Sequence, residues 1–518
     1  MEWWLALFVF GVSITLWIGV GLLRLLTQDA VERRRRVADS TGARRLTPAD
    51  VAVLIPAHNE EASIAATITS VLRLVPGANV HVVADGCTDR TTEIAGSFGV
   101  NVLELQPSRG KAGGIEAAVE HFELARRFEL MLITDADTRL DRHYLDRGLR
   151  LMEDPAMAAL AGYAHVDWQP AAVNGLGRLL LSYRTRLYAV MQGMKYGQTW
   201  RHTNVTPIVP GFASMYRTRL LPRMELNPPG LVIEDFNMTF ELHRKKLGKI
   251  AFEPSVYGIC QDPENLRDYY RQICRWWLGF WQTLRRHGLW FSVFSAALVL
   301  FLFEVFVVSL VLLLVVASLV FLAAEPATGG LALQWDWYAP VHAWLDPLIT
   351  PLNLVVFLWL PDYLLTCLVA LWLRRPSLLV YGVGFIFLRV LDAVVTVRTL
   401  IQLCREKSTG RWTSPARRSV QVLSADGHAP GAAGGDVAGG VAVAAPADDR
   451  PAAALNWRDA APVLFDGALV LALLLLAAAL LVLGVAASVI LGMTVATVVV
   501  CALLALIVPW YRARREDR

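Results

Sequence analysis

The sequence predicts an α/β domain with a mostly parallel, Rossmann-like sheet, joined to an α-helical transmembrane region. Of the 518 residues, 55% are hydrophobic and only 18% are charged, whereas an ordinary soluble domain is roughly a quarter charged. Short β-branched runs alternate with amphipathic stretches between residues 51 and 260, as is typical of parallel sheets. Long uncharged segments lie on both sides of this region. These three observations together predict a membrane enzyme.

The charges and cysteines exclude several classes of protein. The 49 basic and 45 acidic residues give a net charge of only +4, which is too balanced to imply a nucleic-acid partner. The six cysteines are widely scattered, without a CxxC pattern or metal-ligand spacing. Neither a disulfide framework nor a zinc site is therefore indicated, and a reduced cytosolic face fits this pattern.

An uncharged stretch near the amino terminus predicts a membrane anchor. Residues 3–23 carry no charge, which is enough for the roughly 20 residues that a spanning helix needs, and they lack a signal-peptide cleavage site. Arg24 and the basic run 33–36 follow directly, so the positive-inside rule places the next segment in the cytosol. We expect a transmembrane helix within residues 1–28 and a cytosolic domain over residues 45–262.

Four strands and three helices are expected in the cytosolic domain. The strand segments are 51–55, 80–84, 101–105 and 129–134. The helical segments between them are 60–73, 89–97 and 112–126. Ligands bind at the carboxyl ends of the strands in such sheets, so the polar side chains that follow each strand are the candidate site.

Acidic and small polar residues follow the predicted strands. IPAHNEE places Ala57 and Glu60 after the first strand, Asp85 follows the second, and ITDADT places Asp135 and Asp137 two residues apart after the fourth. Each acid alone could simply cap a helix. Two carboxylates at a rigid strand end suit Mg²⁺ or Mn²⁺, and the series of acidic strand ends favours a site over a set of solvated turns.

Two further motifs admit both a structural and a functional interpretation. Lys111 in SRGKAGG is either a solvated surface lysine or a point charge for a phosphate group. Glu234 and Asp235 precede a probable helix in LVIEDFNMTFEL. They either favour the positive amino end of that helix or supply a general base.

Residues 263–290 predict an amphipathic interfacial helix. Its apolar positions recur at helical spacing: Leu266, Tyr270, Ile273, Trp277, Phe280, Trp281 and Leu284. The accompanying basic residues and tryptophans favour a position along the membrane surface. Gln272, Arg275 and Trp276 lie at i, i+3 and i+4, so they share one face; alone, the tryptophan would be an interfacial anchor and the arginine a solvated residue.

Residues 291–402 predict transmembrane helices and an interfacial helix. The sequence has no Lys or Arg from Gly288 to Leu373, and crossings at 298–322 and 351–373 with an external loop between them satisfy this pattern. The apolar stretch 377–402 contains three charged residues. A charge at mid-bilayer costs at least a few kcal/mol, so we expect an interfacial or re-entrant helix there.

The last hundred residues predict a linker and a membrane hairpin. Residues 403–461 are expected to form a cytosolic flexible linker, because residues 424–456 are rich in Ala, Gly, Pro and Asp. Residues 462–518 contain 42 uncharged residues and a basic tail, which suits a transmembrane hairpin. We expect an integral protein of the plasma (inner) membrane.

Seven motifs in order resemble the processive membrane glycosyltransferases of family two: cellulose, hyaluronan, chitin and poly-N-acetylglucosamine synthases. The motifs are PAHNEE, DGCTD, KAGG, DAD, GFASMYR, IED and QICRW, and they lie between residues 50 and 285. The resemblance implies a GT-A catalytic domain that takes a UDP-sugar, with UDP-GlcNAc or UDP-Glc favoured.

The resemblance also implies a role for each candidate residue. It assigns the nucleotide sugar to Ala57, Glu60, Asp85, Lys111, Asp135, Gln272 and Arg275. Within this set, Asp85 would lie near the uracil and Lys111 near the diphosphate. Asp137, with Asp135, would hold Mg²⁺ or Mn²⁺. Asp235, with Glu234, would be catalytic, and Trp276 and Glu234 would contact the acceptor.

These features predict an inverting, metal-dependent enzyme that polymerises a β-linked polysaccharide on the cytosolic face and moves it outward. Its partners would be the UDP-sugar, the growing polysaccharide and the lipid bilayer. One alternative is a non-processive transferase that adds one or a few sugars to a lipid or small acceptor. Another is a transporter or channel with a cytosolic regulatory domain, to which Glu304 and Asp362 would contribute.

Overall fold

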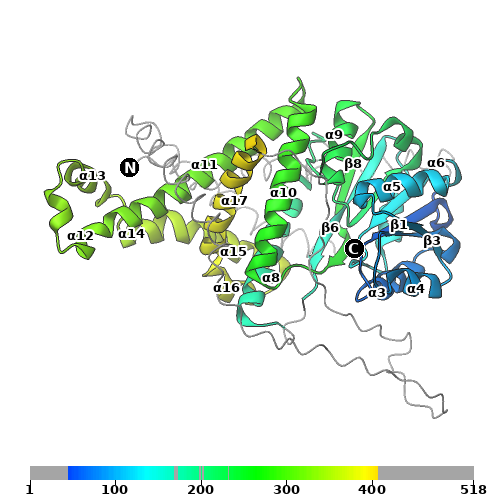
Figure 1. The fold of residues 1–518 in the computed structure, drawn as a ribbon, viewed down its shortest axis with the longest axis horizontal. Helices are drawn as coiled ribbons and strands as arrows, with labels where there is room; N and C mark the ends of the chain where they lie inside the picture. Colours follow the sequence, from blue (N-terminus) through cyan, green and yellow to red (C-terminus); the bar gives the residue numbers. More distant parts are fainter. Residues whose placement is uncertain (1–44, 169–172, 198–199, 201–202, 232, 406–518) are drawn as a thin grey trace, which may run out of the picture.

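The computed structural model describes residues 45–168, 173–197, 200, 203–231 and 233–405. The predicted amino-terminal anchor and the predicted carboxy-terminal hairpin lie outside the described residues, as does nearly all of the predicted linker. The described chain has two parts. A sheet with its covering helices forms one part, and the helices that follow residue 265 extend from it on the side away from β1 and β3 (Figure 1).

The described residues form one mixed sheet of eight strands in the order β3-β2-β1-β4-β7-β6-β8-β5. The strands are β1 (Val51–Ala57), β2 (Val80–Asp85), β3 (Asn101–Leu105), β4 (Leu130–Thr134), β5 (Arg139–Leu140), β6 (Met157–Val166), β7 (Ala213–Arg217) and β8 (Lys249–Cys260). β1 pairs in parallel with β2 and β4, β2 with β3, and β6 with β8. β7 is antiparallel to β4 and β6, and β5 to β8. The predicted α/β fold with a mostly parallel sheet is confirmed, with the four predicted strands at β1 to β4.

Helices cover the sheet and bury its central strands. They are α3 (Ile64–Leu72), α4 (Thr91–Ser97), α5 (Gly110–His121), α6 (Leu124–Arg127), α7 (Tyr144–Met152), α8 (Gly175–Tyr188), the π-helix Ala189–Tyr196 and α9 (Glu234–Arg244). Every residue of β1 and β2 is buried. This explains why apolar residues predominate in both strands, because a parallel strand covered on both faces needs apolar side chains on both.

The second part is built from helices, several of them long and apolar. They are α10 (Leu266–His287), α11 (Val293–Leu322), α12 (Ala324–Ala327), α13 (Tyr338–Leu345), α14 (Pro351–Leu354), the π-helix Val355–Trp359, α15 (Leu360–Leu373), α16 (Ser377–Gly382) and α17 (Phe385–Arg405). Within the described residues, two segments are long and apolar enough to cross a membrane, Val293–Ala327 and Pro351–Leu373. These segments coincide with the two crossings predicted between residues 298 and 373.

The apolar stripe of α10 contacts other helices of the protein. Ile273, Phe280 and Trp281 are buried, and the indole N–H of Trp281 donates to the Thr399 hydroxyl of α17 at 3.3 Å. The stripe that predicts a membrane-surface helix is therefore covered at these positions by protein. The position of α10 relative to a membrane stays a prediction.

The segment predicted as an interfacial helix contains α17, a continuous helix that packs against α10 and α11. Its charged groups have protein partners. Arg389 Nη1 lies 2.6 Å from Asp362 Oδ1, and Asp392 accepts hydrogen bonds from the hydroxyls of Tyr183 and Tyr269 at 2.7 and 2.9 Å. The expectation of an interfacial position treated these charges as unpaired. Pairing within the protein repays part of the cost of burying them.

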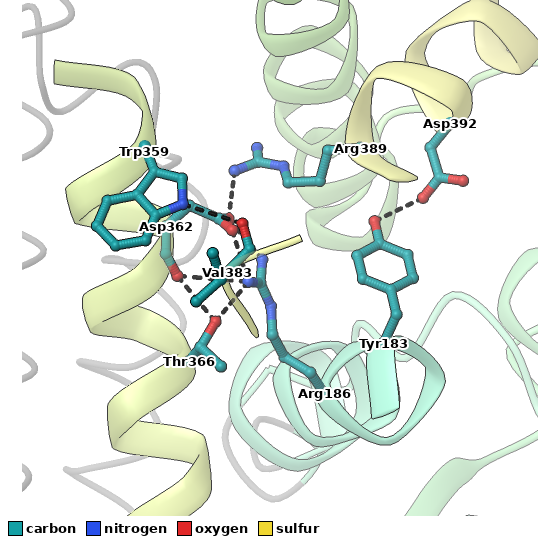
Figure 2. A network of polar contacts seen from close by, with 8 residues as sticks. All are labelled: Tyr183, Arg186, Trp359, Asp362, Thr366, Val383, Arg389 and Asp392. Atoms are coloured by element: carbon teal, nitrogen blue, oxygen red, sulfur yellow. Dashed lines mark hydrogen bonds and ion pairs between the residues drawn. The ribbon is translucent and has the colours of Figure 1, made fainter. Parts of the chain in front are cut away.

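Two buried ion pairs join the sheet domain to the apolar helices. Asp362 of α15 binds Arg186 of α8 through both carboxylate oxygens, at 2.5 and 2.6 Å, and the Thr366 hydroxyl accepts from the same guanidinium at 2.7 Å (Figure 2). Lys195 Nζ lies 2.6 Å from Glu304 Oε2 of α11. Both acids that would suit an ion pathway are thus neutralised by cations from the segment between β6 and β7.

We predict that Asp362→Asn destabilises the folded protein by about 3–5 kcal/mol, because it leaves the buried Arg186 and the half-buried Arg389 without a counter-charge. Thermal unfolding of the detergent-solubilised protein would measure the effect as a lowered Tm. Asp336→Asn is the matched control, since Asp336 is exposed. Equal Tm values for the two variants would contradict the prediction.

Candidate active site

The candidate residues gather at one edge of the sheet. β1, β2 and β4 end at this edge, and β7 begins there because Thr134 pairs with Ala213 in antiparallel register. The loop after β4 and the loop before β7 therefore lie side by side. The Asp135 amide donates to the Phe212 carbonyl at 3.2 Å, which fixes the two loops together.

Lys111 joins three segments of this edge. Its Nζ lies 2.7 Å from Asp135 Oδ1 and 2.8 Å from Glu234 Oε1, and it donates to the Gly211 carbonyl at 3.4 Å. Burial alone would lower the pKa of Lys111, but the carboxylates of Asp135 and Glu234 raise it above the ordinary lysine value. Lys111 is therefore a permanent cation among the acids and not a solvated surface lysine.

Gly211 is the close contact that permits this arrangement. A Cβ atom at residue 211 would lie 2.8 Å from Lys111 Nζ and 2.8 Å from Glu234 Oε1. Any side chain there would displace the ends of both charged groups. The amide of Gly211 also donates to Asp235 Oδ2 at 3.3 Å, so this residue contacts both acids of the IED motif.

The two acids at the amino end of α9 differ in their surroundings. Glu234 is 6% exposed and paired with Lys111. Asp235 accepts backbone hydrogen bonds from Gly211 and from Phe236, the latter at 2.7 Å. Burial and then the nearby negative charge of Glu234 raise the pKa of Asp235 to about 7. Asp235 is therefore the acid better suited to exchange a proton near neutral pH.

A cavity of about 510 Å³ connects these groups with α10. Nine of the eleven predicted site residues line it: Glu60, Lys111, Asp135, Asp137, Glu234, Asp235, Gln272, Arg275 and Trp276. The structure thus brings the predicted face of α10 opposite the acidic edge of the sheet. The cavity continues between α11, α15 and α17, where its lining includes Phe301, Leu312, Leu365 and Thr396.

In the described chain, the other two predicted site residues, Ala57 and Asp85, lie outside the lining of this cavity. Ala57 is fully buried at the end of β1. Asp85 is 1% exposed, and its carboxylate accepts hydrogen bonds from the Ser108 hydroxyl and the Arg109 amide, both at 2.7 Å. This contact ties the end of β2 to the loop before α5 and so helps to place Lys111.

Asp135 and Asp137 supply the hard oxygen atoms that Mg²⁺ and Mn²⁺ prefer. Both side chains line the cavity. No group of three or more His, Cys, Asp or Glu side chains in the described residues is placed to hold a metal ion. The donor set fits a cation held by one or two carboxylates together with oxygen atoms of a bound substrate.

Arg184 is a cavity residue that the sequence motifs missed. It is fully buried on α8, and its guanidinium carbon lies 4.4 Å from the ring centroid of Trp276. Within the described residues its Nε and Nη1 have no hydrogen-bond partner, an arrangement that ordinarily costs about 1–3 kcal/mol for each group. Arg184 stands in YRTRLY, which has no motif spacing, so no sequence signal distinguishes it from its neighbours.

Comparison with known proteins finds matches to this region. Residues 48–279 match the protein family described as "Glycosyltransferase like family 2". The chain is 27% identical over 242 residues to a probable glycosyltransferase, YdaM, of Bacillus subtilis. The aligned region covers 44% of this chain and 54% of YdaM. It is 35% identical over 105 residues to a dolichyl-phosphate hexose transferase of Haloferax volcanii, covering 20% of this chain and 44% of the relative.

Among solved structures, the chain resembles the mannosyltransferase PcManGT of Pyrobaculum calidifontis in complex with GDP-Man and Mn²⁺. The TM-score is 0.40 at 19% identity, covering 65% of this chain and 96% of PcManGT. The chain spans about half the length of the two curated relatives. Residues 48–279 form a glycosyltransferase family 2-like domain with a GT-A-like architecture, and at the level of this domain the prediction of a glycosyltransferase is confirmed.

Proposed function

We propose that the protein is an inverting, metal-dependent glycosyltransferase that elongates a β-linked polysaccharide from a UDP-sugar, with UDP-GlcNAc and UDP-Glc as the favoured donors. One observation carries the proposal. A single cavity contains the acids of the sheet edge, Lys111 and the Gln272–Trp276 face of α10, and it extends between the apolar helices. Membrane insertion belongs to the same proposal and is supported by the two apolar segments. We also propose a cytosolic position of the domain, which the basic residues 33–36 favour by the positive-inside rule.

The proton transfer falls to Asp235. Its carboxylate is held by two backbone amides and would accept the proton of the acceptor hydroxyl as that oxygen attacks the anomeric carbon. The bond from this carbon to the diphosphate oxygen breaks on the opposite side, so the configuration inverts. Glu234, fixed by Lys111, would orient the acceptor and keep the pKa of Asp235 raised.

The leaving diphosphate requires positive charge. Lys111 and Arg275 both line the cavity and would neutralise it, Lys111 as a point charge and Arg275 through paired N–H groups. Asp135 and Asp137 would hold Mg²⁺ or Mn²⁺, which supplies further charge to the diphosphate when bound. The proposed contact of Asp85 with the uracil would be indirect, because its carboxylate is occupied by Ser108 and Arg109.

A second candidate function is transfer of one sugar, or a few, to a lipid-linked acceptor. Its supporting observation is the inner end of the cavity, where Phe301, Val305, Val308 and Leu312 of α11 present apolar surface. The curated relative named as a dolichyl-phosphate hexose transferase supports the same alternative. Trp276 beside the acids favours a sugar acceptor, so we retain the polymer as the first candidate.

The deciding experiment is incubation of the purified full-length protein with a panel of UDP- and GDP-sugars and either Mg²⁺ or Mn²⁺. A ladder of long products on a gel that a linkage-specific β-glycosidase degrades would support polymerisation. A single short product extracted with lipid would support the second candidate. Absence of turnover with every donor would overturn both.

We predict that Asp235→Asn lowers sugar transfer by roughly 10²–10⁴-fold, the usual contribution of a general base. The substituted amide cannot accept the proton but retains the size of the carboxylate, so binding of UDP by calorimetry should stay within a few-fold of wild type. Asp146→Asn, at an exposed position on α7, is the control. Equal turnover of the two variants would refute the role of Asp235.

The raised pKa of Asp235 predicts a pH dependence of the rate. The base acts only when deprotonated, so kcat/KM should fall as the pH drops below about 7 and level off above it. The measurement is initial UDP release between pH 5 and 9 at saturating metal. A rate that stays constant from pH 9 down to pH 5 would contradict a catalytic base with a pKa of about 7.

Gly211→Ala should separate site geometry from folding. The new methyl group would push Lys111 Nζ and Glu234 Oε1 apart, and a displacement of this size lowers kcat/KM by roughly 10²-fold. The Tm should change little, because flexible side-chain ends can move. Gly96→Ala is the control, since no atom of another segment lies within 4 Å of the position that a Cβ would take there. A similar loss of activity in both variants would contradict the prediction.

A further inference from the structure

We infer that Arg184 binds hydroxyl groups of an acceptor sugar next to Trp276 and thereby helps to define the acceptor site. The inference rests on the proposed function, and it assigns to Arg184 a ligand that is a neutral sugar unit and not a phosphate. Three observations support it: the Nε and Nη1 groups of Arg184 lack hydrogen-bond partners within the described residues, a carboxylate lies near the guanidinium, and Trp276 and Gln272 contact it.

Arg184 is built into the wall of the cavity. Its side chain is fully buried, and its guanidinium carbon lies 4.4 Å from the ring centroid of Trp276 and 4.7 Å from that of Tyr269. Nη2 donates to Gln272 Oε1. Two aromatic rings and one amide therefore hold the guanidinium in place before any ligand binds.

The remaining donors of Arg184 point to a ligand. Nε and Nη1 have no hydrogen-bond partner in the described part of the chain, although each is buried. Buried polar groups are nearly always paired in native proteins, and this side chain lines the cavity that holds Asp235. Oxygen atoms of a bound substrate would supply the partners.

The charge near Arg184 favours a neutral ligand. Nε lies 3.7 Å from Asp262 Oδ1, too far for a hydrogen bond but close enough for the carboxylate to offset part of the positive charge. The Tyr188 hydroxyl donates to the same oxygen at 2.8 Å and holds it there. An oxyanion would meet the field of Asp262, whereas a sugar hydroxyl has lone pairs for the guanidinium and no charge.

The neighbours of Arg184 are of the kind that contact sugars. Hydroxyl groups project from the edges of a sugar ring, so a ring placed beside Trp276 would present oxygen atoms to the adjacent N–H groups. The diphosphate has cations of its own at Lys111 and Arg275. Arg184 is thus a binding residue for the acceptor.

The test measures donor and acceptor separately in the full-length protein. The probe is chitotetraose or cellotetraose, whichever matches the sugar that the wild type incorporates. Arg184→Gln should raise the KM for the tetrasaccharide at least tenfold. The KM for the UDP-sugar, and the slow hydrolysis of UDP-sugar without acceptor, should stay within twofold of wild type. Arg178→Gln, on the same helix but outside the cavity lining, should match wild type in every measurement.

Several results would overturn the inference. A raised donor KM with an unchanged tetrasaccharide KM would assign Arg184 to the diphosphate. An unchanged tetrasaccharide KM in both Arg184→Gln and Arg184→Lys would leave it without a role in acceptor binding. Arg184→Lys retains the charge and a donor, so it serves where Arg184→Gln does not fold, and its tetrasaccharide KM should rise to an intermediate value. Failure of the wild type to turn over any nucleotide sugar would instead refute the proposed function.

Discussion

The shared ion pair of Lys111 is the interaction on which the candidate site depends. One ammonium group contacts carboxylates from the end of β4 and the start of α9, at 2.7 and 2.8 Å. These segments are far apart in sequence and would repel each other if brought together without a cation. The Gly211 carbonyl completes the contact. The electrostatics of the site therefore follow from one lysine at the first turn of α5.

Much of the fold could be predicted from the residues. The apolar runs at 51–55 and 80–84, the second interrupted only by His81, belong to strands buried on both faces, and that pattern is visible in sequence. The spacing of Gln272, Arg275 and Trp276 predicted one helical face, and all three line the cavity. Buried strands and helical faces can be predicted in this way because both follow from the order of neighbouring residues along the chain.

Partners distant in sequence account for what could not be predicted. Asp85 stands at the end of a strand, where ligand-binding acids are expected. Its carboxylate accepts hydrogen bonds from the Ser108 hydroxyl and the Arg109 amide. Arg389 seemed costly in an apolar stretch, and its partner Asp362 lies 27 residues away on another helix. Arg184 had no motif at all. In each case the chemistry of a side chain depends on a contact that neither composition nor periodicity encodes.

The buried pairs Arg186–Asp362 and Lys195–Glu304 constrain how the two parts of the protein can evolve. Each pair places one charge in the segment between β6 and β7 and the other in an apolar helix. Separating the two parts would leave an unpaired charge from each ion pair in both parts. Neither part could therefore be transferred to another protein without the other. An exchange of the catalytic domain between relatives would have to carry these helices with it, which couples the inheritance of the chemistry to that of its surroundings.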